Sequence, residues 1–122
     1  MGLAQLARFR RTYNAGDVIC RQGEEAHEFF ILESGAIGIY CNDQKVAQVD
    51  VVGDYIGELG VLLKQKRNAT MKCEEPTQCF ALPANGLDRL LAANPDVAMK
   101  LIISLAQRLD ETTGKLHALH AA

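Results

Sequence analysis

Two charged residues and several glycines between Ile56 and Thr70 could do chemistry together. Gly57 and Glu58 open a short helical pattern, and Arg67 follows nine residues after the glutamate. A helix N-terminus carries unpaired N–H groups and the positive end of the peptide dipole, so it attracts phosphate. An arginine adds a permanent charge and a planar fork of donors. The segment therefore predicts a pocket for one phosphate with a hydroxyl-bearing group beside it, which is the size of a nucleotide.

The negative charge of Glu58 would lie beside the bound phosphate, and this like-charge contact requires an explanation. Its carboxylate would repel phosphate unless it accepts a hydrogen bond from a ligand hydroxyl, which makes it a candidate ribose contact. The alternative is that Glu58 is a first-turn acid that suits the helix dipole and that Arg67 is an ordinary surface residue. The joint presence of the glycines and of this spacing favours the phosphate site.

The segments that must position this site have the sequence pattern of short β-strands. Short apolar runs alternate with glycine-containing turns from Thr12 to Leu82, which is typical of an antiparallel barrel or a double-sheet jelly roll. Glu58–Leu63 is the only helical patch within this region. We predict strands at the runs Val18–Arg21, Glu28–Leu32, Ala36–Tyr40, Lys45–Val51, Thr70–Cys73 and Gln78–Leu82, with a core filled by Tyr13, Phe29, Phe30 and Phe80.

Helical patterns flank the strands at both ends. Residues 2–10 form a short amphipathic pattern, and residues 84–93 form another after Pro83. Asn94 is placed as the N-cap of a last helix with Pro95 at its first position, and this helix can run toward His120. Apolar residues recur along it at three- and four-residue spacing, as in a coiled coil. We call this set the C-terminal seam: Ile102, Leu105, Leu109, Thr112, Leu116 and Leu119.

Length and composition predict one globular domain over residues 1–122, with a β-roll at about 11–83 and helices at about 84–120. The 122 residues are 48% hydrophobic and 23% charged, with a net charge of −2. This charge argues against nucleic-acid binding by this chain alone, which needs a basic face. The one dense arginine cluster, Arg8 with Arg10 and Arg11, is interpreted as a solvated helix end.

Several further sites and compartments are excluded or disfavoured. No apolar run approaches the roughly 20 residues that cross a bilayer, and no signal-peptide core is present, so we expect a cytoplasmic protein without a membrane contact of its own. Four scattered cysteines are expected to be small apolar strand residues and not a disulfide or metal site. His117 and His120 could chelate a metal, although solvated histidines are favoured. No catalytic constellation is visible, so the chain is not expected to be an enzyme.

Three ordered stretches carry a family resemblance. They are Ala15–Ile19 with Gln22–Glu24, Phe29–Gly35, and Gly53–Leu59 with Arg67–Thr70. The chain resembles the cyclic nucleotide-binding domain of the catabolite activator protein, protein kinase A regulatory subunits and cyclic nucleotide-gated channels. The resemblance implies a mainly β fold with flanking α-helices. That fold is an eight-stranded antiparallel β jelly roll (a double-stranded β-helix) with a short N-terminal helix and C-terminal helices.

The third stretch is similar to the phosphate-binding cassette of that family, and this similarity implies a role for each residue. Gly57 would let the backbone approach the ligand, and Glu58 would accept a hydrogen bond from the ribose 2′-OH. The N–H groups of Leu59, Gly60 and Ala69 are candidates to hold the cyclic phosphate.

Arg67 would pair with the exocyclic phosphate oxygens in the same cassette. Asn68 departs from the alanine, serine or threonine that is common after this arginine. A threonine there reaches the purine in relatives that prefer the guanine form. Asparagine could act as donor and acceptor in its place, or could weaken either preference. The ligand is therefore expected to be cAMP or cGMP, with cAMP favoured.

These expectations together predict a regulatory sensor domain that binds its ligand and does not convert it. Cyclic nucleotide would draw the short helix inward, and the helices after Pro83 would close over the purine with Leu101, Ile102 or Leu105 as lid contacts. They would transmit the event to an attached effector domain or a partner protein, with a possible homodimer through the last helix. The alternative is a dimerisation or docking module with a degenerate or differently specific pocket, which the C-terminal seam supports.

Overall fold

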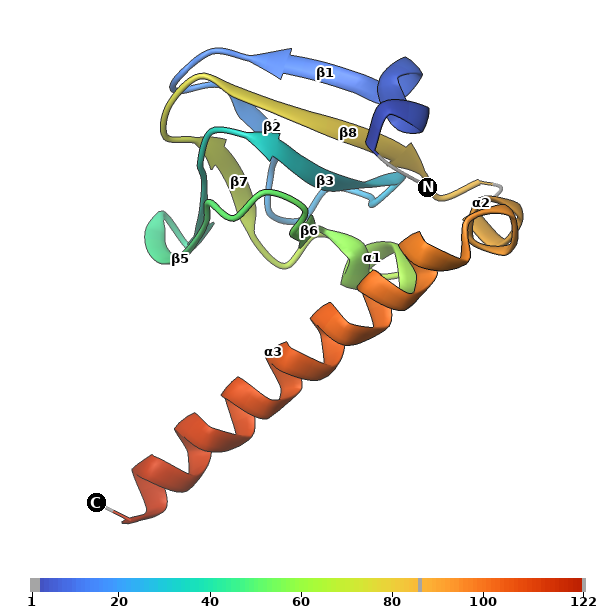
Figure 1. Ribbon diagram of the computed structural model, residues 1–122. Helices are drawn as coiled ribbons and strands as arrows, with labels where there is room; N and C mark the ends of the chain where they lie inside the picture. The colour runs from blue at the N-terminus through green and yellow to red at the C-terminus, as the bar shows by residue number, and fades with distance from the viewer. Residues whose placement is uncertain (1–2, 86, 122) are drawn as a thin grey trace. The chain divides into compact units, whose positions relative to one another are not determined.

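The computed structural model describes residues 3–85 and 87–121, and it describes side chains over 6–58, 60–85 and 88–111 (Figure 1). The chain divides into two compact units, Gly2–Leu87 and Asp88–Ala122. The first holds the strands and the second holds nearly all of α2 and α3. In chain order the elements are η1 Leu3–Phe9, β1 Arg10–Tyr13, β2 Val18–Cys20, β3 Glu28–Ser34, β4 Ile37–Cys41, β5 Gln44–Val49, β6 Tyr55–Ile56, α1 Glu58–Leu62, β7 Thr70–Cys73, β8 Thr77–Pro83, α2 Leu87–Ala93 and α3 Pro95–Ala121.

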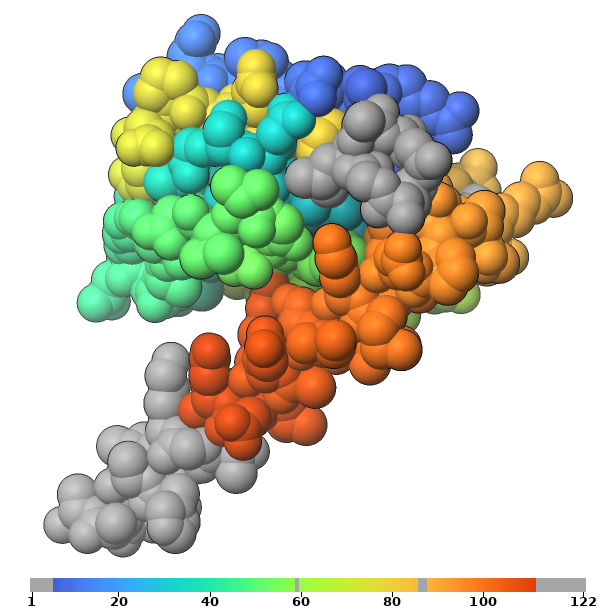
Figure 2. Space-filling view, in the orientation of Figure 1, coloured from blue at the N-terminus to red at the C-terminus, as the bar shows by residue number. Residues whose placement is uncertain are grey.

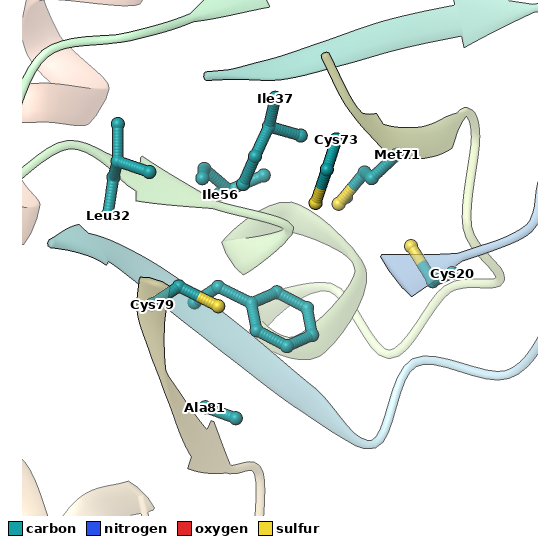
Figure 3. Packing of buried hydrophobic residues seen from close by; sticks show 9 residues of the cluster. Cys20, Leu32, Ile37, Ile56, Met71, Cys73, Cys79 and Ala81 are labelled. Atoms are coloured by element: carbon teal, nitrogen blue, oxygen red, sulfur yellow. The ribbon is translucent and has the colours of Figure 1, made fainter. Parts of the chain in front are cut away.

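The strand unit consists of two four-stranded sheets, with the orders β1-β8-β3-β6 and β2-β7-β4-β5. Every strand pair is antiparallel. The main core cluster draws side chains from both sheets, so it lies between them (Figure 3). The mainly β jelly roll that the sequence predicts is confirmed. The members of this core cluster are Cys20, Phe30, Leu32, Ile37, Ile56, Met71, Cys73, Cys79 and Ala81.

Several elements differ from the sequence prediction in their bounds, in their type or in not having been predicted. Arg10 begins β1 and does not end a helix, and the residues before it form a 3₁₀-helix. The two-residue strand β6 has no sequence prediction, because Tyr55–Ile56 is too short to show an alternating pattern. Helix α2 begins at Leu87 and not at Ala84. Single-sequence patterns fix the type of a long element better than its ends.

Arg10 and Arg11 of the arginine cluster lie on β1 and not at a helix end, whereas Arg8 lies in the last turn of η1. Arg10 donates from Nε and Nη2 to Glu33 at 2.7 Å each, and Arg11 donates from Nη1 and Nη2 to Glu28 at 2.5 and 2.8 Å. Both are therefore bidentate ion pairs between β1 and β3 across β8. The interpretation of Arg10 and Arg11 as part of a helix end was therefore wrong, although both side chains are exposed.

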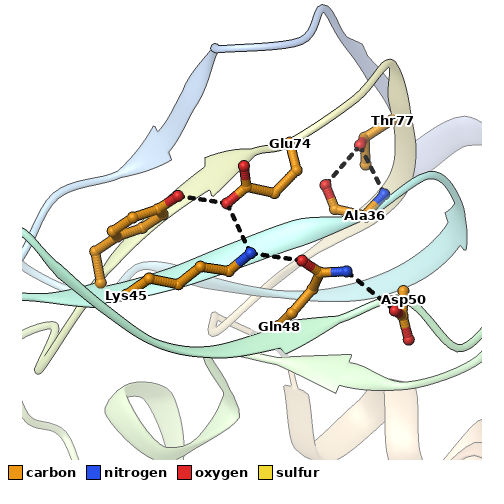
Figure 4. A network of polar contacts seen from close by, with 7 residues as sticks. Ala36, Lys45, Gln48, Asp50, Glu74 and Thr77 are labelled. Carbon is orange, nitrogen blue, oxygen red and sulfur yellow. Dashed lines mark hydrogen bonds and ion pairs between the residues drawn. The ribbon is translucent and has the colours of Figure 1, made fainter.

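A second polar network lies on the sheet that contains β4. Tyr40 donates to the Glu74 carboxylate, and Lys45 lies 3.4 Å from the same carboxylate (Figure 4). The chain of contacts continues through Gln48 to Asp50. A Cβ at Gly38 would lie 2.0 Å from the Glu74 Oε1 atom, so only glycine leaves room for this carboxylate.

The four cysteines lie on strands, as the sequence predicts, and all four are free thiols. Cys20, Cys73 and Cys79 are buried, whereas Cys41 is half-buried at the end of β4. Burial is the largest cause that raises the pKa of Cys79 to about 12, and it also raises the pKa of Cys20 and of Cys73.

These environments predict selective alkylation of one thiol. Thiolate is the reactive form, and only Cys41 combines access with a position outside the core cluster. We expect iodoacetamide at pH 8 to modify Cys41 first in the native protein, with the other three thiols modified only after denaturation. Mass spectrometry of tryptic peptides checks this order. Equal native modification of Cys79 would contradict the packed core.

The helical unit contains a capping residue with two tasks. The Asn94 carbonyl accepts from the N–H groups of Val97 and Ala98 at 3.0 and 3.2 Å, at the start of α3. Its side-chain Nδ2 donates to the Leu90 carbonyl at 2.7 Å, so the side chain satisfies the end of α2 instead of capping α3. The predicted position is thus correct, but the side chain serves the preceding helix.

Helix α3 carries exposed apolar side chains on its described part, which is coloured orange to red-orange in Figure 2. Of the C-terminal seam, Ile102 is 59% exposed and Leu109 is 69% exposed, while Thr112, Leu116 and Leu119 lie outside the described side chains, as do His117 and His120. Met99 and Ile103 are exposed as well. No helix in the described chain has both the length and the apolar character to cross a membrane.

Candidate functional site

The candidate site lies where β3 and β6 separate. Strand β6 pairs with β3 only through Ile56 with Phe30 and Tyr55 with Ile31. Gly57 then adopts a φ of +78°, a conformation that side-chain-bearing residues rarely take, and α1 begins at Glu58. The turn leaves the main-chain carbonyls at the diverging ends of β3 and β6 without strand partners.

The side chain of Arg67 donates a hydrogen bond to a main-chain carbonyl at each of these two strand ends. Its Nη1 donates to the Gly57 carbonyl at 2.9 Å, and its Nη2 donates to the Glu28 carbonyl. The guanidinium carbon also lies 5.8 Å from the centre of the Phe30 ring, within the range of a cation–π contact. Arg67 is 6% exposed, so the alternative of an ordinary surface arginine is wrong.

The main chain of Arg67 is held by a different turn. Its N–H donates to the Glu24 carbonyl at 2.8 Å, and its carbonyl accepts from the Gly23 N–H at 2.8 Å. Gly23 has a φ of +90°, so the turn requires glycine. The Gln22 N–H donates to the Thr70 hydroxyl at 3.0 Å. The Gln22–Glu24 motif therefore anchors the backbone on which the arginine side chain depends.

Two glycines allow the chain to lie close to the guanidinium. A Cβ at Gly57 would lie 2.5 Å from Arg67 Nη1, and a Cβ at Gly60 would lie 2.8 Å from the Ala26 Cβ and 3.7 Å from the same nitrogen. Any larger residue at either position would displace the arginine or its surroundings. This contact explains physically why glycine stands at both positions.

The remaining cassette residues lie on α1 and on the segment after Arg67. Glu58 is the first residue of α1 and is 1% exposed, although it is charged. Burial and then the charge of Glu58 raise the pKa of the neighbouring Tyr55 to about 12. Leu59 and Gly60 follow on α1, and Ala69 is buried next to β7.

Asn68 has an exposed side chain, unlike its neighbours on either side. Its main-chain carbonyl accepts a long hydrogen bond of 3.5 Å from the Cys41 thiol. The residue that follows the arginine therefore leaves its amide group open to solvent or to a ligand. The seven candidate residues thus fall on one stretch of chain that is organised around Arg67.

The buried charge of Arg67 has no ion-pair partner among the described residues. Its side-chain bonds go to main-chain carbonyls, and the ion pairs between described residues do not include it. Its Nε is buried and has no hydrogen-bond partner among those residues. A buried cation with an unused donor is costly unless an anion completes its environment. A phosphate oxygen fits this requirement, whereas a metal ion does not. No cluster of three or more potential metal ligands occurs in the described chain.

Comparison with known proteins decides the family. A family model for the cyclic nucleotide-binding domain matches residues 10–94, which contain all the cassette residues above. The chain belongs to the cyclic nucleotide-binding domain family. It is 33% identical over 85 residues to the cAMP-dependent protein kinase type II regulatory subunit of Drosophila melanogaster, covering 70% of this chain and 22% of that protein.

Other members of the cyclic nucleotide-binding domain family extend the match. The chain is 26% identical over 109 residues to the cAMP-activated global transcriptional regulator CRP of Escherichia coli O6:H1, covering 85% of this chain and 52% of that protein. The Thermus thermophilus catabolite activator protein superposes with a TM-score of 0.80 at 28% identity, covering 96% of this chain and 57% of that structure. The chain thus spans between 22% and 52% of the length of these two curated relatives.

The sequence prediction missed two residues around the site of this cyclic nucleotide-binding domain. Glu28 was predicted only as a strand residue, although its carbonyl accepts from Arg67. Arg11 was assigned to a solvated cluster, although it holds the Glu28 carboxylate. Main-chain contacts of this kind leave no residue-type pattern in the sequence. The only indication of these contacts in the sequence was that two arginines, Arg10 and Arg11, stand next to each other.

Proposed function

We propose that the chain is a regulatory sensor domain that binds a cyclic purine nucleotide, with cAMP favoured over cGMP. The observation that carries the proposal is the buried guanidinium of Arg67, which has an unused Nε donor and no ion pair among the described residues. A cyclic phosphate brings one negative charge and two exocyclic oxygen acceptors. It therefore compensates the charge and accepts the unused hydrogen bond.

In this proposal each cassette residue has one task. Arg67 pairs with the exocyclic phosphate oxygens, and the N–H groups of Leu59, Gly60 and Ala69 complete the phosphate contacts. Gly57 keeps the backbone close to the ligand. Buried Glu58 accepts the ribose 2′-OH, which gives the carboxylate a ligand partner that is itself a donor.

Base preference rests on the residue after the arginine. The exposed amide of Asn68 is free to reach a purine, but it offers both a donor and an acceptor, so it does not select the guanine form as a threonine would. Both curated relatives named above are cAMP-dependent or cAMP-activated proteins. These two arguments favour cAMP.

We further propose that the strand unit and the helical unit act as one domain and that α2 and α3 transmit binding. Helices after the cassette would change their equilibrium position when the nucleotide is present, with Leu101, Ile102 or Leu105 as contacts to the purine. The shift requires only that the nucleotide bind one state more tightly than the other. The receiver is an attached effector domain or a partner protein in the cytoplasm.

The exposed apolar residues of α3 favour a second candidate. Met99, Ile102, Ile103 and Leu109 are each at least 48% exposed, which suits a helix that packs against another protein or a second copy of this chain. A dimerisation or docking module could use this surface while its pocket is degenerate or takes a different acid. A measurement of cyclic nucleotide binding distinguishes the sensor role from the docking role.

A thermal melt with nucleotide tests the choice. A ligand that binds the native state at 100 times its Kd stabilises it by about 2.7 kcal/mol, roughly a 10 °C rise in melting temperature for a domain of this size. We expect this rise with cAMP, a smaller one with cGMP at equal concentration, and none with 5′-AMP, which lacks the ring. An unchanged melting temperature with both cyclic nucleotides at millimolar concentration would favour the docking module.

A further inference from the structure

The Arg11–Glu28 ion pair is connected to the candidate phosphate site through one residue, Glu28. Arg11 lies on β1 and Glu28 is the first residue of β3, two strands away in the same sheet. The guanidinium of Arg11 makes a bidentate contact with the Glu28 carboxylate at 2.5 and 2.8 Å. The main-chain carbonyl of the same Glu28 accepts from Arg67 Nη2. One residue therefore connects the two arginines, through its side chain on one side and its backbone on the other.

The Glu28 carbonyl takes its donor from Arg67 because it faces away from β8. Glu28 lies opposite Pro83 on β8, and the Ala84 N–H donates to the His27 carbonyl at 2.8 Å, so Glu28 and Pro83 form a non-hydrogen-bonded pair whose main-chain groups point away from each other. On the β6 side, the paired part of the strand ends at Phe30, two residues further on. The carbonyl that orients Arg67 thus lies beyond the part of β3 that pairs with β6.

We propose that Arg11 is a positioning residue for the phosphate site: by fixing the Glu28 carboxylate to β1, it holds the Glu28 carbonyl where Arg67 needs it. A planar arginine fork on a carboxylate fixes orientation as well as distance. Arg11 itself touches no ligand in this arrangement and acts only through Glu28 and Arg67. The inference rests on the proposed function, because it assigns a role at the cyclic phosphate site.

The chain contains a matched control on the next residue. Arg10 makes the same kind of bidentate pair with Glu33, at 2.7 Å for both contacts. The arginine side chains are comparably exposed, 48% for Arg11 and 40% for Arg10. Glu33, however, is not among the hydrogen-bond partners of Arg67 in the described part of the chain. The two pairs therefore separate a general effect on the sheet from a specific effect on the site.

The experiment is isothermal titration of cAMP into Arg11→Gln, Arg10→Gln, Arg67→Lys and the double variant Arg11→Gln/Arg67→Lys, with melting curves for each. We expect Arg11→Gln to raise the Kd by about two- to fivefold, the scale of a partly exposed ion pair. Arg10→Gln should leave the Kd unchanged, although both single variants lower the melting temperature similarly. In the Arg67→Lys background, Arg11→Gln should add little, because residues that act through one another are not additive.

Each outcome bears on the inference. Equal Kd values for Arg11→Gln and Arg10→Gln, or a full additional loss in the double variant, would overturn the positioning role while leaving the cyclic nucleotide site intact. Failure of the unmodified chain to bind cAMP or cGMP would overturn the proposed function and this inference together. If Arg11→Gln does not fold, Glu28→Gln removes the ion pair and keeps the main-chain carbonyl, and it should show the same rise in Kd.

Discussion

Replacing Arg67 by alanine is expected to weaken cAMP binding by about 2–3 kcal/mol or more, which is at least a roughly 30-fold rise in Kd. The guanidinium is the one buried positive charge at the site, and its Nε has no partner among the described residues. Removing it takes away a charge-assisted hydrogen bond to the phosphate and the charge that compensates the anion. Isothermal titration calorimetry at constant ionic strength measures the loss.

The same substitution also has a cost for folding. The side chain satisfies the carbonyls of Gly57 and Glu28, and an unsatisfied buried group costs about 1–3 kcal/mol. A melting curve of Arg67→Ala must therefore accompany the titration, and affinity is compared well below the transition. Arg67→Lys is the second variant, because it keeps the charge and loses the fork, and it should bind more weakly than the unmodified chain but more tightly than Arg67→Ala.

Lys66→Ala provides the matched control for net charge. It removes one positive charge from the adjacent, exposed position, so long-range electrostatics change equally. We expect its Kd to stay within about twofold of the unmodified value, as for other exposed charges. An Arg67→Ala variant that folds and binds with unchanged affinity would show that the phosphate is not held at this guanidinium.

The family was predictable, and the cassette could be proposed, because the residue types that carry both have few substitutes. Glycine at a φ of +78°, an acid at the first turn of a helix and an arginine nine residues later leave a pattern in the chain. Glycine-bounded apolar runs likewise predicted six of the strands. In these places the side chain or its absence is itself the cause of the local structure.

The parts that could not be predicted depend on the backbone of distant segments. Strand β6 is two residues long and exists because Tyr55 and Ile56 pair with β3, which no local pattern encodes. The contacts of Arg67 with the carbonyls of Gly57 and Glu28 need only a peptide group, so any sequence at those positions supplies the acceptor. Two adjacent arginines are compatible with a helix end and with a strand. Only the position of β3, which carries their glutamate partners, distinguishes the two interpretations.

Replacing Glu58 by alanine is expected to remove the preference for ribose over 2′-deoxyribose. In the proposed site the carboxylate accepts the 2′-OH, and a hydrogen bond to a charged group is worth about 1.5–3 kcal/mol. The unmodified chain should therefore bind cAMP roughly 10- to 150-fold more tightly than 2′-deoxy-cAMP. Glu58→Ala should bind the two ligands alike, with most of the loss on the cAMP side.

The comparison of two ligands in one variant separates this role from a general effect on the site. Glu58 is 1% exposed and begins α1, so its removal also alters the local packing and the helix start. Such effects weaken cAMP and 2′-deoxy-cAMP equally and leave their ratio unchanged. Glu58→Gln retains an oxygen acceptor without the charge and should keep a reduced preference for ribose. An unchanged ratio of the two Kd values in Glu58→Ala would assign the ribose contact to another residue, and the buried carboxylate would then serve only the structure of the cassette.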